Sequence, residues 1–241
     1  DEGKLDQALA EFNRAVSVNP RDAEAHFLRG LIYNKQGRLD EAIANFSKGL
    51  EFDNRFARTY GERGLAYAKK AQYDLALADF RKALEIDPTY AEAYNNRGST
   101  YTRLTHHDLA LNDFNKALEL NPNYAKAYYN RAVIYLNLGQ YDRALRDLNR
   151  AVELNPRDAE AFHNRGLALE KMSQFDRALA DFTTTLELNP RLAIAYYSRA
   201  VTLEKAGRRK EARQAFEDFL DHASPDLASQ IEYARSKVGN P

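Results

Sequence analysis

AEAYNNRGSTYTRLTHHDLALNDFNKALELNPNY, residues 91–124, contains the pattern that decides the fold of this 241-residue chain. Ala91, Tyr94 and Gly98 are spaced three and four residues apart, which places them on one stripe of an α-helix. A second apolar stripe follows and ends at Asn121, because a residue that precedes proline is pushed out of the helical region. The stretch therefore predicts a helix, a short turn and a second helix.

The second predicted helix begins around Asp108. An aspartate at this point can cap free backbone N–H groups and interacts favourably with the positive end of the helix dipole. The residues that we expect on its buried side are Leu109, Leu111, Phe114, Ala117 and Leu118.

The same pattern recurs with a period of 34 residues along the chain. The period carries five of the seven prolines: Pro20, Pro88, Pro122, Pro156 and Pro190. It also carries an alanine at each of Ala8, Ala42, Ala76, Ala110, Ala144, Ala178 and Ala212, and an arginine at each of Arg29, Arg63, Arg97, Arg131, Arg165 and Arg199. A repeat of this length predicts an open stack of units, each burying its apolar face against its neighbours.

The repeat resembles the tetratricopeptide repeat (TPR) family, whose period and helix–turn–helix signature it shares over essentially the whole chain. It departs from the family pattern at two positions: Tyr, Phe or His replaces the Trp, and Arg replaces the Leu before Gly. The resemblance implies an all-α, right-handed α–α superhelical solenoid and a role in binding other proteins.

We expect a single solenoid over residues 1–241. Residues 1–22 form the second half of an earlier unit, which suggests a fragment or a lost N-terminus, and residues 227–241 form a capping helix with a polar outer side. The six full repeats are 23–56, 57–90, 91–124, 125–158, 159–192 and 193–226.

Composition excludes several classes of protein. Lys+Arg and Asp+Glu number 35 each, whereas a duplex nucleic-acid binder normally carries a basic excess. No apolar run approaches the roughly 18 residues of a membrane helix, so we expect no membrane insertion. The chain has no cysteine, which removes thiolate metal sites and cysteine nucleophiles. This lack leaves the compartment open; we favour the cytoplasm, and a bacterial periplasmic location is also compatible.

The arginine row has a partner of opposite charge in the second helix. An aspartate follows 16 residues after the arginine in four central units, which predicts structural ion pairs within each unit. The pairs are Arg63 with Asp79, Arg97 with Asp113, Arg131 with Asp147, and Arg165 with Asp181. We prefer this interpretation to an anion-binding stripe, because Arg97 lies only about 60° from Tyr94 around the helix.

The other side of the first helices is where TPR arrays, by resemblance, form a concave groove that binds peptides. Asn96, Asn130 and Asn164 occupy equivalent positions there, and an amide can both donate and accept the hydrogen bonds of a peptide backbone. The alternative is that these asparagines are simply solvated. The predicted groove residues are Asn95, Asn96, Ser99, Arg103, Tyr129, Asn130, Asn137, His163, Asn164, Lys171, Tyr197 and Ser198.

A carboxylate clamp like that of chaperone-binding TPR domains fits the sequence poorly. Asn96, Asn130 or Asn164 matches its second asparagine, but no alignment supplies the remaining Lys, Asn and Arg.

The sequence therefore predicts a protein-interaction scaffold that binds a peptide segment of a partner protein. A self-associating homo-oligomeric scaffold and the regulatory arm of a larger enzyme are the alternatives. We expect no enzyme activity, cofactor or metal, since the five histidines lack metal-ligand spacing and no phosphate loop or nucleophile motif is present.

Overall fold

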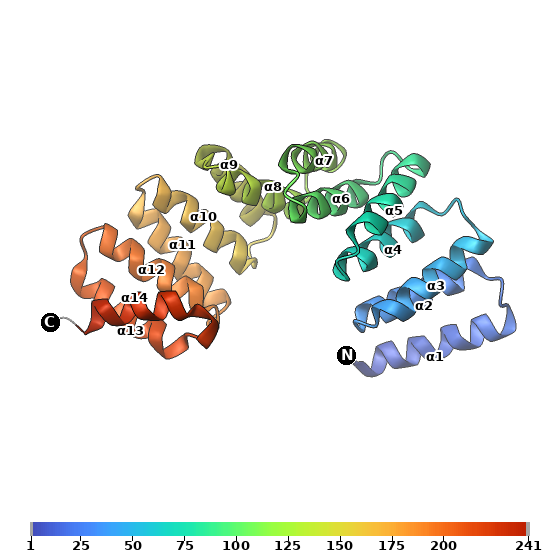
Figure 1. Ribbon diagram of the computed structural model, residues 1–241, viewed down its shortest axis with the longest axis horizontal. Helices are drawn as coiled ribbons and strands as arrows, with labels where there is room; N and C mark the ends of the chain where they lie inside the picture. The colour runs from blue at the N-terminus through green and yellow to red at the C-terminus, as the bar shows by residue number, and fades with distance from the viewer. Residues whose placement is uncertain (1, 240–241) are drawn as a thin grey trace. The chain divides into compact units, whose positions relative to one another are not determined.

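The computed structural model describes residues 2–239, and within this range the chain forms only helices (Figure 1). Helices pair in hairpins, as the 34-residue period predicts. The first helices of the six full repeats are α2 (Ala23–Lys35), α4 (Ala57–Lys69), α6 (Ala91–Arg103), α8 (Ala125–Asn137), α10 (Ala159–Lys171) and α12 (Ala193–Lys205). The second helices are α3 (Leu39–Phe52), α5 (Tyr73–Ile86), α7 (His107–Leu120), α9 (Tyr141–Leu154), α11 (Phe175–Leu188) and α13 (Arg209–His222).

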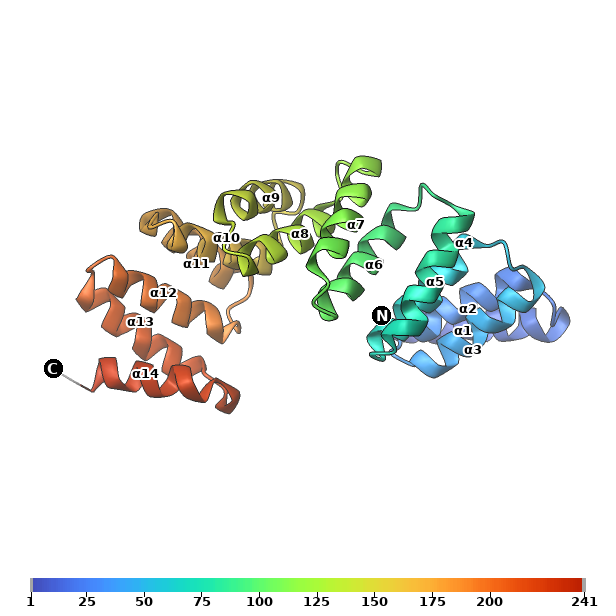
Figure 2. The same cartoon turned by 45° about the horizontal axis from the view of Figure 1, so that its top comes forward.

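Single helices flank the hairpins. α1 (Glu2–Val18) packs on α2. After α13, a 3₁₀ turn (Pro225–Leu227) leads into α14 (Ala228–Val238), which packs on α13 (Figure 2). The contacts divide the chain into two compact units, one up to Pro122 and one from Asn123, here named the first unit and the second unit.

Each hairpin turn contains one residue with a positive φ angle. Glycine occupies this position at Gly37, Gly139 and Gly207, but Ala71, Thr105 and Ser173 adopt it in the other three turns. The residue after it donates a backbone hydrogen bond back to the first helix, as His106 does to the carbonyl of Tyr101 at 2.9 Å. This is the Schellman arrangement, and it ends the first helix so that the second can fold back.

The second helices begin slightly earlier than the sequence suggested. α7 starts at His107 with His106 as its N-cap, and the His106 side chain makes no capping hydrogen bond. Asp108 lies inside the first turn, so the predicted capping role for this position is wrong, and only its favourable interaction with the helix dipole remains.

A phenylalanine between the helices of a hairpin determines how closely they approach. Phe114 is fully buried, and a Cβ added to Gly98 would lie 2.8 Å from its Cε1 atom. At this distance a side chain on residue 98 would require the ring to shift, whereas the hairpin of α12 and α13 combines Ala200 with a buried Phe216. In the hairpin of α8 and α9 the pair becomes Ala132 and Leu148, where a smaller apolar group leaves room for a methyl.

One predicted core residue is exposed. Leu109 retains 47% of its surface, although it was expected on the buried side of α7. It lies one residue before the buried Ala110, at the edge of the stripe where the helix turns away from its neighbours.

Candidate functional site

The arginine row lies against the second helices. In the first unit, Arg97 donates from Nε and Nη2 to the two carboxylate oxygens of Asp113, at 2.8 and 2.7 Å. This hydrogen bond raises the pKa of Arg97 above its ordinary value. The same two-pronged geometry recurs between Arg63 and Asp79, Arg131 and Asp147, and Arg165 and Asp181.

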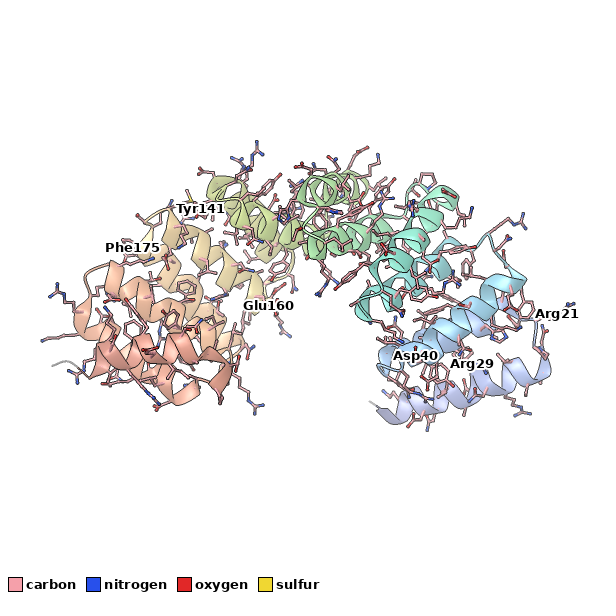
Figure 3. The ribbon with its side chains drawn as sticks, viewed as in Figure 1. Arg21, Arg29, Asp40, Tyr141, Glu160 and Phe175 are labelled. Atoms are coloured by element: carbon pink, nitrogen blue, oxygen red, sulfur yellow. The ribbon has the colours of Figure 1, made fainter. Side chains whose placement is uncertain are left out.

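The outer members of the row differ. Arg29, labelled on α2 in Figure 3, donates from Nε to the amide oxygen of Asn45 at 2.6 Å. Arg199 lies opposite an alanine, Ala215, and its Nη2 instead donates to Asp218 on the next turn of α13 at 2.9 Å.

The predicted groove residues of the first unit lie on α6 at very different depths. Asn95 is fully buried, and its amide donates to the side-chain oxygen of Asn96 at 3.3 Å. Asn96 and Ser99 are half-buried, and Arg103 is exposed. The exposed surface at this end of α6 is therefore smaller than the sequence pattern suggests.

Neighbouring first helices of the first unit are linked by polar side chains. Lys69 on α4 donates to the amide oxygen of Asn34 on α2 at 2.7 Å, and the amide of Asn34 reaches Glu62 at 3.5 Å. Burial raises the pKa of Glu62 above its ordinary value.

In the second unit, Tyr129 connects α8 with α10. Its hydroxyl donates to Glu160 at 3.1 Å and accepts from the Nδ2 amide of Asn164 at 3.1 Å. Burial, followed by the nearby charge of Glu160, raises the pKa of Tyr129. Figure 3 shows Glu160 near the start of α10, at the opposite end of the hairpins from Tyr141 and Phe175. The amide of Asn164 is thus held in a fixed orientation by a protonated phenol.

His163 and Ser198 form the next link, from α10 to α12. His163 Nε2 lies 3.0 Å from the Ser198 hydroxyl oxygen. The centroid of the imidazole lies 5.6 Å from that of the Phe182 ring. Burial lowers the pKa of His163 to about 4, so the ring is neutral near pH 7. Ser198 is buried, and its hydroxyl donates to the backbone carbonyl of Ile194, so its oxygen is left to accept from His163 Nε2.

The third predicted aromatic residue, Tyr197, packs mainly against the C-terminal helices. Its ring makes a tilted contact with Phe219 and an edge contact with Tyr233, with ring centroids 5.2 and 6.2 Å apart. Asn137 and Lys171 are exposed at the C-terminal ends of α8 and α10, and Asn130 is half-buried at the position equivalent to Asn164.

Sequence analysis missed Glu170, the buried carboxylate of this surface. Lys205 on α12 donates to Glu170 on α10 at 2.6 Å, and Thr202 approaches it at 3.4 Å. The equivalent position holds Leu136 in the preceding repeat and Glu204 in the following one, so the residue type alone gave no signal of burial. Glu170 had no visible partner in the sequence, because Lys205 is 35 residues away.

Residues 2–239 contain no cluster of His, Cys, Asp or Glu that could hold a metal ion. None of the helices described in this range is both long and apolar enough to cross a membrane.

Paired helices repeated through both units define an all-α repeat fold. Models of the tetratricopeptide repeat match residues 1–54, 57–90, 91–124, 125–158 and 163–228. The chain belongs to the tetratricopeptide repeat family, whose members are generally non-catalytic.

No curated protein matches the chain, but solved structures do. YrrB, described as a TPR protein with an unusual peptide-binding site, is 29% identical over 79% of this chain and 97% of its own, with a TM-score of 0.67. MamA is 28% identical over 67% of this chain and 94% of its own, with a TM-score of 0.59. A chain of the APC/C hetero-tetramer Cut9–Hcn1 has a TM-score of 0.82 at 18% identity, over 97% of this chain and 46% of its own, which shows a shared fold only.

Proposed function

We propose that the chain binds an extended peptide segment of a partner protein along the first helices of the second unit, α8, α10 and α12. The proposal concerns the surface formed by Tyr129, Asn130, His163, Asn164 and Lys171. These side chains lie on the neighbouring first helices α8 and α10, which the hydrogen bond from Asn164 to Tyr129 links.

The hydrogen-bonding capacity of Asn164 is the observation that carries the proposal. Its side-chain amide has two N–H groups and one oxygen, and only one N–H is used, in the bond to Tyr129. The oxygen can accept from a backbone N–H of a peptide, and the second N–H can donate to a backbone carbonyl. Because Tyr129 already fixes the amide, less side-chain entropy is lost on binding.

The groups around Asn164 suit a polypeptide without requiring one sequence. His163 is neutral near pH 7 and offers a flat ring, and the half-buried Tyr129 offers another. Lys171 and Glu160 are both exposed, so charges of either sign in a peptide find a partner at the rim. YrrB, at 29% identity, is a TPR protein with a peptide-binding site, which supports this class of ligand.

A corresponding surface in the first unit is part of the proposal but has fewer exposed groups. Asn96 accepts a hydrogen bond from Asn95 with its oxygen, which leaves its N–H groups to donate. Ser99 and Arg103 lie further along α6.

The test is to select binders from a phage-displayed random peptide library and measure their affinity by fluorescence anisotropy. We expect N164A combined with N130A to weaken binding at least tenfold, a loss of about 1.4 kcal/mol. N96A measures the contribution of the first unit separately. The matched control is N112A, which removes an exposed asparagine on α7.

Thermal unfolding of each variant must be compared with that of the wild type, so that a folding defect is not mistaken for lost contacts. Equal affinity of the N130A/N164A protein and the wild type for every selected peptide would refute the proposed surface.

A further inference from the structure

Arg199 lacks the carboxylate that four equivalent arginines bind. In the preceding repeat, Arg165 donates from Nε to Asp181 at 2.8 Å. Ala215 stands at the position equivalent to Asp181. The Nε atom of Arg199 is buried and has no hydrogen-bond partner. A buried guanidinium N–H without an acceptor is costly, since the other arginines of the row satisfy theirs.

A hollow of about 340 Å³ lies where the missing side chain would be. Arg199 and Ala215 line it, and Leu179 and Leu203 provide an apolar wall. This volume is at the lower end of the range for small-molecule sites, about 300–1,000 Å³. The hollow therefore combines a cation with an unused donor, an apolar wall and space for several atoms.

The other charges around the hollow are already paired. Arg208 binds Glu211 through two hydrogen bonds of 2.8 and 2.5 Å. Asp218 accepts from Arg199 Nη2 at 2.9 Å and from Gln214 at 3.3 Å. The unmet requirement is an acceptor for Arg199 Nε, and a carboxylate oxygen provides the strongest acceptor of matching geometry.

We propose that this hollow binds a carboxylate carried on a short aliphatic stem. One oxygen accepts from Arg199 Nε, in the place that Asp181 occupies in the preceding repeat. The stem lies against Leu179 and Leu203. The site lies between α11, α12 and α13, is separate from the peptide-binding proposal, and does not depend on it. The carboxylate is either a free small acid or an acidic side chain of a polypeptide.

The direct test is to titrate the full chain, labelled with ¹⁵N-arginine, with sodium propionate and to follow the Nε–Hε signals by NMR. Sodium chloride at equal ionic strength is the reference, and R199K assigns the signal. We expect a saturable shift of the Arg199 signal with millimolar affinity, because one charge-assisted pair to a small ligand supports only weak binding. Absence of a propionate-specific shift would overturn the proposal.

Two variants locate the site. A215D places a carboxylate in the hollow, as in the four preceding repeats. We therefore expect it to abolish the propionate shift and to raise the melting temperature. A180D adds the same charge at an exposed position of α11 outside the hollow, and should leave the shift unchanged. A shift that persists in folded A215D would place binding elsewhere and refute the assignment. If A215D does not fold, the wild-type titration still decides the proposal.

The source of the carboxylate is distinguished by a second ligand. N-acetyl-aspartate with its α-carboxyl group amidated mimics an acidic side chain within a polypeptide. Tighter binding of this compound than of propionate indicates a polypeptide ligand, and the reverse order indicates a free acid; either order supports a carboxylate site. Failure of both compounds to shift the Arg199 signal refutes it.

Discussion

The first and second units share their internal packing but differ on the surface of their first helices. Phe114 and Phe182 are both fully buried against a glycine, and Asp113 and Asp181 bind their arginines with the same geometry. On the first helices, however, the links are Asn34 with Glu62 and Lys69 in the first unit. In the second unit, aromatic groups take part through Tyr129 and His163.

The difference shows that the positions which repeat without change determine packing, while the positions which vary determine what each unit exposes. Each unit also has a titratable group on its first helices whose pKa is shifted by burial, an acid in the first unit and a base in the second. Burial raises the pKa of Glu62 in the first unit and lowers that of His163 in the second. Substitutions at shared positions should therefore affect both units equally, and changes in pH should separate them.

Truncating the shared phenylalanine should give the largest effect. We expect F114A and F182A each to destabilise their own unit by about 3–5 kcal/mol through lost burial and a residual cavity. Hydrogen exchange read separately for residues 91–122 and 159–192 measures this local loss. A large effect in one unit and none in the other would contradict equivalent packing.

The matched rescue uses the alanine–leucine pair that the hairpin of α8 and α9 contains. G166A alone should be destabilising, because the added Cβ would lie 2.6 Å from Phe182. F182L combined with G166A reproduces the Leu148 and Ala132 pair and should recover part of the stability. If the double variant is no more stable than G166A, close contact with the ring is not what requires glycine.

Breaking the ion pair should have the next largest effect. We expect D113A and D181A to cost roughly 3 kcal/mol each, the lower limit for a buried pair, because the guanidinium groups remain about a fifth exposed. Replacing both members, as in R97M/D113L, should restore much of the stability. Denaturant unfolding measures each change, with D108A as the control for an exposed aspartate. A double variant as unstable as D113A would show that the pair itself contributes the stability.

Acidification should destabilise the second unit selectively. His163 has a pKa of about 4 when folded and about 6.5 when unfolded, so the unfolded chain binds more protons as the pH falls. The stability is therefore present above pH 6.5 and is lost towards pH 4, with a loss of about 2 kcal/mol by pH 5. Hydrogen exchange in the second unit should show this slope, and H163Q should remove it.

The first unit provides the opposite sign. The raised pKa of Glu62 means that the folded state holds this proton more tightly, so the contribution of Glu62 becomes less favourable as the pH rises. Acidification of the first unit should therefore bring no loss from this residue. An equal loss in both units, unchanged in H163Q, would contradict the assignment to His163.

The sequence predicted the features that depend on residue spacing within one repeat. It did not predict burial that depends on contacts with neighbouring helices. The period, the hairpins and the end of the second helix at Asn121 follow from local rules, as does the approach of Arg97 to the helix that carries Asp113. The burial of Asn95 and of Glu170 does not, because it depends on side chains of adjacent helices. A helical projection places Asn95 beside Asn96 on one face, but it gives no depth. Similarly, the exposed Leu109 shows that an apolar residue at the edge of a stripe carries little information about burial.

The turn position with positive φ should give the smallest effect and the most precise comparison. Ala71 in the first unit has a φ of 57°, and Gly139 in the second has a φ of 70° at the equivalent position. A residue with a Cβ is strained at a positive φ, whereas glycine is not but loses more conformational entropy on folding. We expect A71G to stabilise the first unit by about 0.5–1 kcal/mol and G139A to destabilise the second by a similar amount.

Thermal unfolding of A71G, G139A and the double variant measures both. The effects should nearly cancel in the double variant, because the two residues lie in different units and share no partner. A stabilising G139A would mean that the turn, unlike the core, is built differently in the two units.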